Sequence, residues 1–280
     1  MKLVRYGPSG HEKPGILDAR GELRDLSRII PDVAGKALLP ESIEFLRRTD
    51  VASLPPVENH ARIGPCVGYV GKFICVGLNY SDHIREIGAA VPTEPVLFMK
   101  ATSAICGPDD DIVIPRGATK VDWEVELGVL VGKPGKYIAE RDAYSHIAGY
   151  CVINDLSERV FQLEGTGQWV KGKSADTFGP IGPWLVTTED VADPQQLRLW
   201  LEVDGYRYQN GTTATMIFGV AQLVSYVSRF MSLQPGDVIS TGTPPGVGLG
   251  QTPPVYLRAG NRVRLGIDGL GVQNQRIVTM

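Results

Sequence analysis

The stretch DWEVELGVLVG, residues 122–132, gives the clearest structural signal in the chain. Its apolar second half has the length of a strand, so it predicts a strand that enters a hydrophobic core. A second apolar run, GYCVIND at residues 149–155, has the same character. Two further segments alternate apolar and polar residues and turn at Asp204-Gly205 and Asp268-Gly269, which is the pattern of β-hairpins. We therefore expect β-sheet at the centre of the protein.

Helices contribute less to the predicted fold. The apolar residues between Val220 and Met231 recur at helical spacing, and Pro235-Gly236 follows them. Strands and helices do not alternate as they do in a parallel sheet, so the sequence predicts an α+β fold that is mostly β. The composition changes after a Pro-rich linker at 51–68. We expect a small N-terminal α/β domain at residues 1–70 and a main domain at 71–280.

Composition argues against several classes of protein. The 280 residues include 28 Lys and Arg against 31 Asp and Glu, with no basic block, so a nucleic-acid partner is not expected. No apolar run reaches the ~18–20 residues of a membrane helix, and no apolar signal segment opens the chain. The four cysteines show no closely spaced pair and are predicted to be free thiols. A cytoplasmic protein that acts on a small molecule fits these features.

Two glutamates stand two residues apart at the start of the first apolar run. Side chains two apart on a strand project from one face, so Glu124 and Glu126 should lie close together. Asp155 ends the second run and would add a third carboxylate if the two strands are neighbours. Crowded carboxylates repel, and an all-carboxylate set that binds a cation favours Mg²⁺, Mn²⁺ or Ca²⁺ over zinc. The alternative is two solvent-facing glutamates on an edge strand.

A histidine and a glutamate form a second candidate group. Residues 81–89 predict a short helix capped by Ser81 or Asp82, on which His83 and Glu86 would share one face. A neighbouring carboxylate can orient an imidazole and stabilise its protonated form. An exposed loop histidine is the alternative for a histidine taken alone.

One motif imitates a nucleotide-binding site. Residues 167–174 match the phosphate-loop pattern G-x-x-x-x-G-K-S, which includes Lys173. That loop must open a helix, but the next nine residues, ADTFGPIGP, contain two prolines and two glycines. Nucleotide binding is therefore not expected.

Six motifs in order carry a family resemblance. They are GLNYSDHIRE, FMKATSAICGP, DWEVELGVLVG, GYCVINDLSERVFQ, KGKSADTFGPIGPWLV and GDVISTGTPPGVG. The chain resembles the fumarylacetoacetate hydrolase family, and residues 1–70 resemble the small N-terminal domain of its longer bacterial members. The resemblance implies a mixed β-roll catalytic domain, a bound Mg²⁺ or Mn²⁺ and a homodimer.

The resemblance also implies three sets of functional residues. The implied metal ligands are Glu124, Glu126 and Asp155. The implied catalytic residues are His83 and Glu86, on a mobile lid, and Lys173. The implied substrate-binding residues are Lys100, Gln162 and Thr243. Two departures from the family pattern are Leu78, where some acylpyruvate-hydrolysing members have Arg, and Glu158-Arg159-Val160, where many have Ala-Arg-Asp.

The expected reaction is hydrolysis of the C3–C4 bond of a 2,4-dioxo acid to pyruvate and a second acid. The full-length pattern most resembles members that cleave 2,4-diketo-3-deoxy-L-rhamnonate or -fuconate, with an acid such as lactate as co-product. A decarboxylase, isomerase or lyase acting on oxaloacetate, 2-hydroxyhepta-2,4-dienedioate or ureidoglycolate is the alternative, because each would use the same chelated enolate. A non-catalytic binding protein is a remote third possibility.

Overall fold

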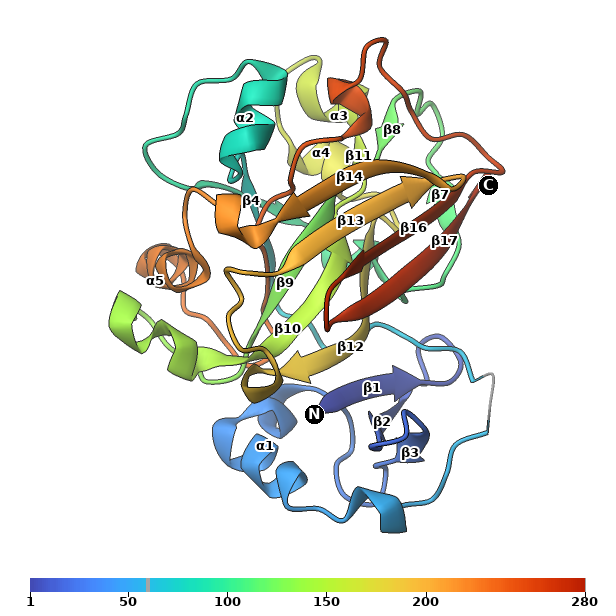
Figure 1. Cartoon of the computed structure of the whole chain (residues 1–280), viewed down its shortest axis with the longest axis vertical. Coiled ribbons are helices and arrows are strands. Elements are labelled where there is room, and N and C mark those ends of the chain that lie inside the picture. The colour runs from blue at the N-terminus through green and yellow to red at the C-terminus, as the bar shows by residue number, and fades with distance from the viewer. Residues whose placement is uncertain (59–60, 280) are drawn as a thin grey trace.

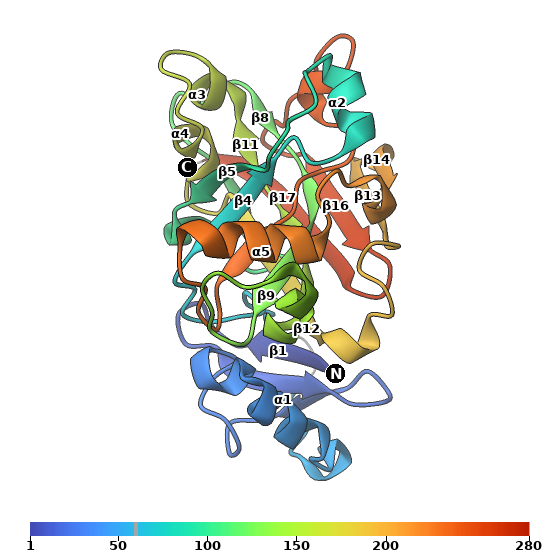
Figure 2. The ribbon, with the colours of Figure 1, turned by 90° about the vertical axis from the view of Figure 1, so that its left-hand side faces the viewer.

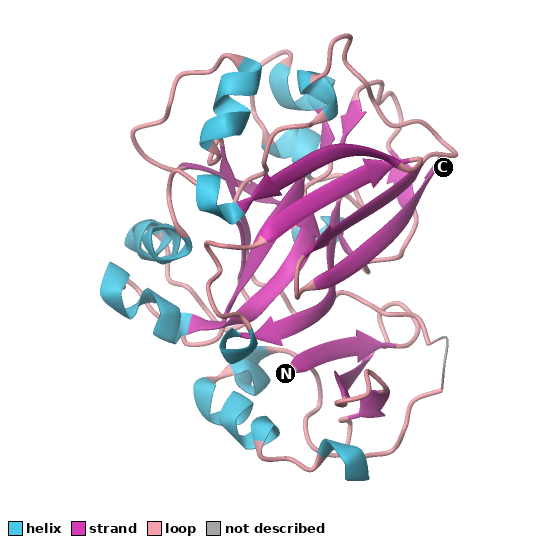
Figure 3. Cartoon of the chain, in the orientation of Figure 1, coloured by secondary structure: helices cyan, strands magenta, loops and turns pink. Residues whose placement is uncertain are grey.

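The computed structural model describes residues 1–58 and 61–279, so residues 59 and 60 of the predicted linker lie outside the described residues. Strands fill the middle of the molecule and helices lie at its periphery (Figure 3). The larger sheet has ten strands. In spatial order these are β3 (Leu23–Asp25), β2 (Lys13–Leu17), β1 (Lys2–Tyr6), β12 (Gly179–Thr187), β10 (Ile147–Asn154), β9 (Val125–Val131), β15 (Val238–Ser240), β4 (Phe73–Gly77) and β5 (Val96–Lys100), with β6 (Ile105–Cys106) beside β12.

A second sheet of five strands lies against the first (Figure 1). Its order is β14 (Tyr206–Thr212), β13 (Arg198–Val203), β16 (Arg262–Ile267), β17 (Gly271–Thr279) and β7 (Ile112–Ile114). Both predicted hairpins are confirmed, because β13 and β14 join at Asp204-Gly205 and β16 and β17 join around Asp268-Gly269. A two-stranded ladder pairs β8 (Val121–Asp122) with β11 (Ser157–Glu158).

Five α-helices surround the sheets in the described part of the chain. They are α1 (Pro40–Arg47), α2 (Ser81–Ile87), α3 (Arg159–Leu163), α4 (Val170–Lys173) and α5 (Val220–Phe230). Short 3-10 helices occupy Gly35–Leu38, Val51–Ser53, Thr102–Ala104, Glu140–His146, Thr188–Asp190, Thr213–Thr215 and Gly248–Gly250. The predicted amphipathic helix is confirmed as α5, which lies across the strands of the large sheet (Figure 2). None of the described helices has the length and apolar character needed to span a membrane.

Alternation along β9 explains how the sheet is packed. Val125, Leu127, Val129 and Val131 are fully buried in the core that also contains α5 and the second sheet. The intervening Leu130 packs into another core beneath the N-terminal segment. The same alternation turns Glu124 and Glu126 away from the first core, at the end of the strand far from that segment.

The first residues extend the large sheet rather than forming a separate one. β1 pairs antiparallel with β12, and residues of α1 share a core with Leu130 and Cys151 of the central strands. In Figure 1 this segment forms the end of the molecule opposite α2, α3 and α4. The division at residues 70 and 71 stays a prediction.

Candidate active site

Three carboxylates meet where the ladder between two central strands ends. The antiparallel pairing of β9 and β10 places Ile153 opposite Glu126 and ends at Asn154 opposite Val125. The Asp155 amide then donates to the Glu124 carbonyl at 2.9 Å, and pairing resumes at β8 and β11. The predicted strand is therefore interrupted at residues 123 and 124, because the chain leaves the regular ladder there.

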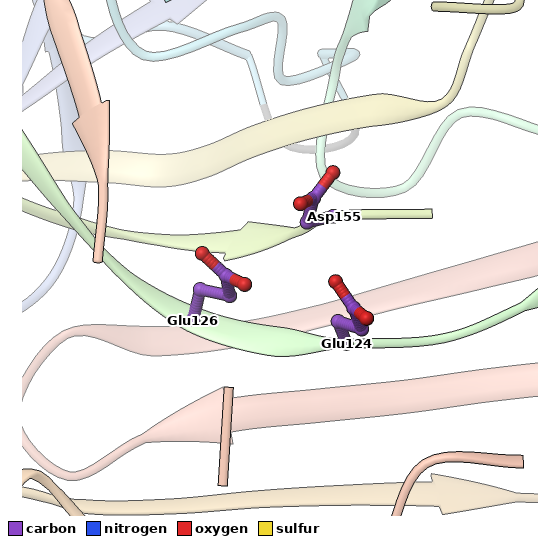
Figure 4. A group of neighbouring side chains, drawn as sticks. All are labelled: Glu124, Glu126 and Asp155. Carbon is purple, nitrogen blue, oxygen red and sulfur yellow. The ribbon is translucent and has the colours of Figure 1, made fainter. Parts of the chain in front are cut away.

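The interruption brings Glu124, Glu126 and Asp155 together. One oxygen from each lies within 4.8 Å of the others, and Figure 4 shows the three side chains directed into a common space. All three are buried, and β9 lies inside the sheet between β10 and β15. The alternative of solvent-facing glutamates on an edge strand is therefore wrong.

Buried cations surround these acids. The Lys173 Nζ atom donates to Glu124 Oε2 at 2.6 Å and to Asp155 Oδ2 at 2.8 Å. Lys100 donates to Asp155 Oδ1 and to the Leu156 carbonyl. The Arg159 guanidinium bridges Glu124 and Asp122, with its Nη2 atom 2.8 Å from Glu124 Oε1 and 2.7 Å from Asp122 Oδ2.

The formal charges of this cluster do not cancel. Four buried carboxylates, Asp122, Glu124, Glu126 and Asp155, face three buried cations, Lys100, Arg159 and Lys173, which leaves −4 + 3 = −1. Glu126 is the carboxylate of this cluster that has no cationic partner. Its Oε2 atom accepts from Ser240 Oγ and the Gly242 amide, and no cation contacts its carboxylate among the described residues.

The pKa values follow this charge distribution. Burial alone would raise the pKa of Glu124, but the charges of Lys173 and Arg159 outweigh it and lower that pKa to about 2. Burial, followed by the charges of Asp155 and Glu124, raises the pKa of Glu126 well above its ordinary value. Glu126 is thus the carboxylate that would gain most from an additional cation.

The acid cluster has the features of a divalent cation site. Its donors are three buried carboxylates, its net charge is negative, and hydrogen bonds from Ser240 and Gly242 orient one ligand. Hard oxygen donors without His or Cys suit Mg²⁺ or Mn²⁺. Glu124, Glu126 and Asp155 are therefore the residues that would hold such an ion.

The histidine and glutamate predicted to act together do make contact. His83 Nδ1 lies 2.9 Å from Glu86 Oε2 on α2, and Glu86 Oε1 accepts from the Gly246 amide at 2.8 Å. Gly250 packs on the same glutamate so closely that a Cβ atom there would lie 2.7 Å from Glu86 Cδ. The predicted Ser81 or Asp82 cap is wrong, because Tyr80 is the N-cap residue and no side chain caps the helix.

A pocket of about 150 Å³ lies over the acids. Of the sequence-predicted residues, His83, Glu124, Glu126, Gln162, Lys173 and Thr243 line it. Asp155 and Lys100 are not among the lining residues, and the contact between them places Lys100 behind the acid cluster. Glu86 does not line the pocket either, and it contacts His83 from outside it.

The chain matches the fumarylacetoacetate (FAA) hydrolase C-terminal family over residues 72–278. The protein belongs to the fumarylacetoacetate hydrolase family. A Burkholderia cenocepacia relative with a provisional hydrolase name is 63% identical over 99% of this chain and 98% of its own. The mostly β architecture with mixed sheets is the fold of this family, as the sequence predicted.

Solved structures similar to the chain include proteins with different named activities. A fumarylacetoacetate hydrolase from Exiguobacterium antarcticum is 36% identical, with a TM-score of 0.86 and 100% coverage of both chains. A maleylpyruvate hydrolase from Sphingobium sp. SYK-6, solved with manganese(II) and pyruvate, is 26% identical, with a TM-score of 0.83 over 100% of this chain and 99% of its own. A 2-hydroxyhepta-2,4-diene-1,7-dioate isomerase from Mycobacterium marinum is 31% identical, with a TM-score of 0.76 over 100% and 98%.

The phosphate-loop pattern has a different role in this fumarylacetoacetate hydrolase family member. Its last residues form the short helix α4, and the chain continues into strand β12 and not into a helix. Lys173 is buried against two carboxylates, where a phosphate would meet repulsion. The structure therefore confirms that no helix follows this pattern, as a phosphate loop would require.

Sequence reasoning assigned no role to several residues of the pocket wall. Arg159 lines the pocket and contacts Glu124. Its position four residues after Asp155 is a signal that could have placed it near the acids. Phe98, Leu163 and Trp169 also line the pocket, but nothing in their local sequence marks them.

Proposed function

We propose that the protein is a metal-dependent hydrolase that cleaves the C3–C4 bond of a 2,4-dioxo acid. The observation that carries this proposal is one pocket lined by Glu124, Glu126 and His83, with Asp155 beside the two glutamates and Glu86 in contact with the histidine. The name of the Sphingobium relative, a maleylpyruvate hydrolase solved with manganese and pyruvate, supports it. When bound, a divalent cation would act as a Lewis acid toward the oxygens of the oxo acid.

His83 would act as the general base. If its Nδ1–H donates to Glu86 Oε2, the Nε2 atom is left free to accept a proton from water. The resulting hydroxyl oxygen bonds to C4, the C3–C4 bond breaks, and its electron pair stays on C3 as the pyruvate enolate. The proton then returns to C3, so one water and one 2,4-dioxo acid give pyruvate and a carboxylic acid.

Lys173 would stabilise the negative charge that develops on the reacting oxygens. Its ammonium lines the pocket, and burial places it where a charge interaction is not weakened by bulk water. Burial alone would lower its pKa, but the charges of Asp155 and Glu124 raise the pKa above its ordinary value. In the protein without a bound metal, Lys173 is therefore a cation that donates to both carboxylates.

A pyruvate-release assay tests the reaction. The substrates are acetylpyruvate, 2,4-diketo-3-deoxy-L-rhamnonate, 2,4-diketo-3-deoxy-L-fuconate and oxaloacetate, each with Mg²⁺ and with EDTA. Pyruvate release from any 2,4-dioxo acid that stops in EDTA supports the proposal. Release from 2,4-diketo-3-deoxy-L-rhamnonate or -fuconate would support the specific substrate that the sequence predicts. Full activity in EDTA would contradict the metal dependence.

An isomerase or decarboxylase is the second candidate. The isomerase name of the Mycobacterium marinum relative favours the isomerase, because that protein has the same fold. Release of pyruvate from oxaloacetate alone would indicate a decarboxylase, and a spectral change of 2-hydroxyhepta-2,4-dienedioate without pyruvate would indicate an isomerase. A homodimer and a cytoplasmic location stay predictions, and light scattering would measure the first.

A further inference from the structure

The two ends of the pocket differ in chemistry. The charged residues that line it, Glu124, Glu126, Arg159 and Lys173, are each at most 7% exposed and form its floor. Its other walls are largely apolar, and their more exposed members stand at the mouth, where Ile87 is 37% and Leu163 is 46% exposed. The remaining large apolar side chains on these walls are Leu78, Phe98, Trp169 and Leu249.

An aromatic pair joins the floor to the mouth. Phe98 and Trp169 meet edge to face with their ring centroids 5.3 Å apart. The Lys173 ammonium lies 5.0 Å from the Phe98 ring centroid, so the apolar wall begins directly at the charged floor. Trp169 rests on bare backbone, because a Cβ atom on Gly77 would lie 2.5 Å from its ring. This part of the wall is therefore a closely packed apolar surface.

The charges of the site also limit what can bind. With all four acids ionised, as they would be around a bound cation, the cluster has a formal charge of −1; a divalent cation would change it to +1 and one carboxylate of a bound oxo acid would return it to zero. A second carboxylate would lie toward the mouth. The two cations among the lining residues, Arg159 and Lys173, are both at the floor and are already paired with acids.

Several polar atoms of the walls are already engaged within the protein. The Thr243 hydroxyl donates to the Val125 carbonyl and accepts from Gln209 Nε2. The Gln162 carbonyl oxygen accepts from Arg159, while its amide nitrogen makes no hydrogen bond to the described residues. A chain of several hydroxyl groups against this wall would lose more hydrogen bonds to water than this one amide could replace.

We propose that the group beyond C4 of the substrate is an alkyl or an aryl group without charge. The inference rests on the proposed function for the orientation of the substrate, with its carboxylate at the floor. It favours acylpyruvates with an apolar acyl group over both the dicarboxylic and the polyhydroxylated 2,4-dioxo acids.

A substrate series tests this preference. The Mg²⁺-loaded protein is given acetylpyruvate, its homologues up to hexanoylpyruvate, benzoylpyruvate, fumarylpyruvate and 2,4-diketo-3-deoxy-L-rhamnonate. We expect kcat/KM to rise about fourfold for each methylene that becomes buried against the wall. Equal values along the alkyl series, or a higher value for the dicarboxylic or the sugar acid, would overturn the inference while leaving the hydrolase proposal intact.

Binding gives a measurement that does not depend on turnover. Calorimetry compares pyruvate, 2-oxohexanoate, 2-oxooctanoate and 2-oxoglutarate on the Mg²⁺-loaded protein. Affinity that increases with alkyl length supports the inference, and tightest binding of 2-oxoglutarate overturns it. If no 2,4-dioxo acid releases pyruvate, the proposed function fails, and this series still decides the character of the pocket.

A substitution at the mouth tests the position of the wall. Leu163→Lys should raise the relative kcat/KM for fumarylpyruvate, and the relative affinity for 2-oxoglutarate, by up to about fivefold at low salt, the size of a surface ion pair. Val170→Lys is the matched control, because Val170 is 42% exposed but does not line the pocket. The same change in both variants, or none in Leu163→Lys, would contradict the proposed position of the acyl group.

Discussion

Lys173→Met tests whether the buried ammonium and a divalent cation stabilise the same carboxylates. Lys173 is 2% exposed and donates to Glu124 at 2.6 Å and to Asp155 at 2.8 Å. Removing one partner of a buried ion pair costs about 3–5 kcal/mol. Arg159 still contacts Glu124 and Lys100 still contacts Asp155, so we expect the lower end, about 3 kcal/mol, in the metal-free protein.

Mg²⁺ should reduce this loss. A ligand at about 100 times its dissociation constant stabilises a folded protein by about 2.7 kcal/mol. In the variant the cation would meet carboxylates that have lost one positive neighbour, so its affinity and its stabilising effect should both increase. This stabilisation applies to parent and variant alike, so only a tighter affinity of the variant reduces their difference. If Lys173→Met binds Mg²⁺ about tenfold more tightly, the stability difference should fall by about 1.4 kcal/mol when Mg²⁺ is saturating, roughly half its metal-free value.

Urea unfolding followed by tryptophan fluorescence, in EDTA and in Mg²⁺, measures both differences. Lys171→Met is the control, because Lys171 lies on the same short helix but is exposed, and among the described residues its ammonium donates a hydrogen bond to Thr166 and contacts no carboxylate. An equal loss of stability in EDTA and in Mg²⁺ would refute the idea that lysine and cation share these ligands. A similar loss in the control would assign the effect to the helix itself.

Three further predictions concern the same site. Because burial and the charges of Asp155 and Glu124 raise the pKa of Glu126, Mg²⁺ must displace a proton there, so its affinity should weaken as pH falls through that raised pKa. Calorimetry should show that Glu126→Gln binds Mg²⁺ at least about tenfold more weakly and without this pH dependence; a pH-independent parent affinity would count against it. His83→Ala should lower kcat by about 10²–10⁴-fold and leave Mg²⁺ affinity nearly unchanged, and an unaltered kcat would remove His83 as the base. Asp122→Asn should cost about 3 kcal/mol in urea unfolding, since Asp122 accepts from Arg159 and from the Gly248 and Leu249 amides; a loss below about 1 kcal/mol would contradict that role.

The acid cluster could be predicted because a strand repeats every two residues. That period predicts Glu124 and Glu126 on one face, and the two side chains do meet, although the regular ladder is interrupted at Glu124. Asp155 required one further assumption, that the two apolar runs are neighbours, and the pairing of β9 with β10 meets it. The interruption of the ladder at residues 123 and 124 has no counterpart in the local pattern, because it depends on contacts with Asp155 and β11.

Residues that act across the sheet could not be placed in the same way. Lys100 ends β5 at the edge of the large sheet, yet its side chain reaches Asp155, 55 residues further along the chain. Phe98 and Trp169 meet only because α4 folds back over β5. No sequence spacing encodes such contacts, so the family pattern indicated which residues matter but not which of them reach the pocket.

The division of the pocket into floor and mouth bears on how activity varies among related proteins. Solved proteins of this fold include a maleylpyruvate hydrolase and a 2-hydroxyhepta-2,4-diene-1,7-dioate isomerase. A cation held by three carboxylates can stabilise an enolate for either reaction, so the floor does not determine the substrate. In the proposed orientation the mouth would do so, since it would contact the part of the substrate in which these acids differ. Substitutions at Leu163 and Trp169 should therefore change substrate preference more than the type of reaction, whereas substitutions at Glu124, Glu126 and Asp155 should abolish either reaction.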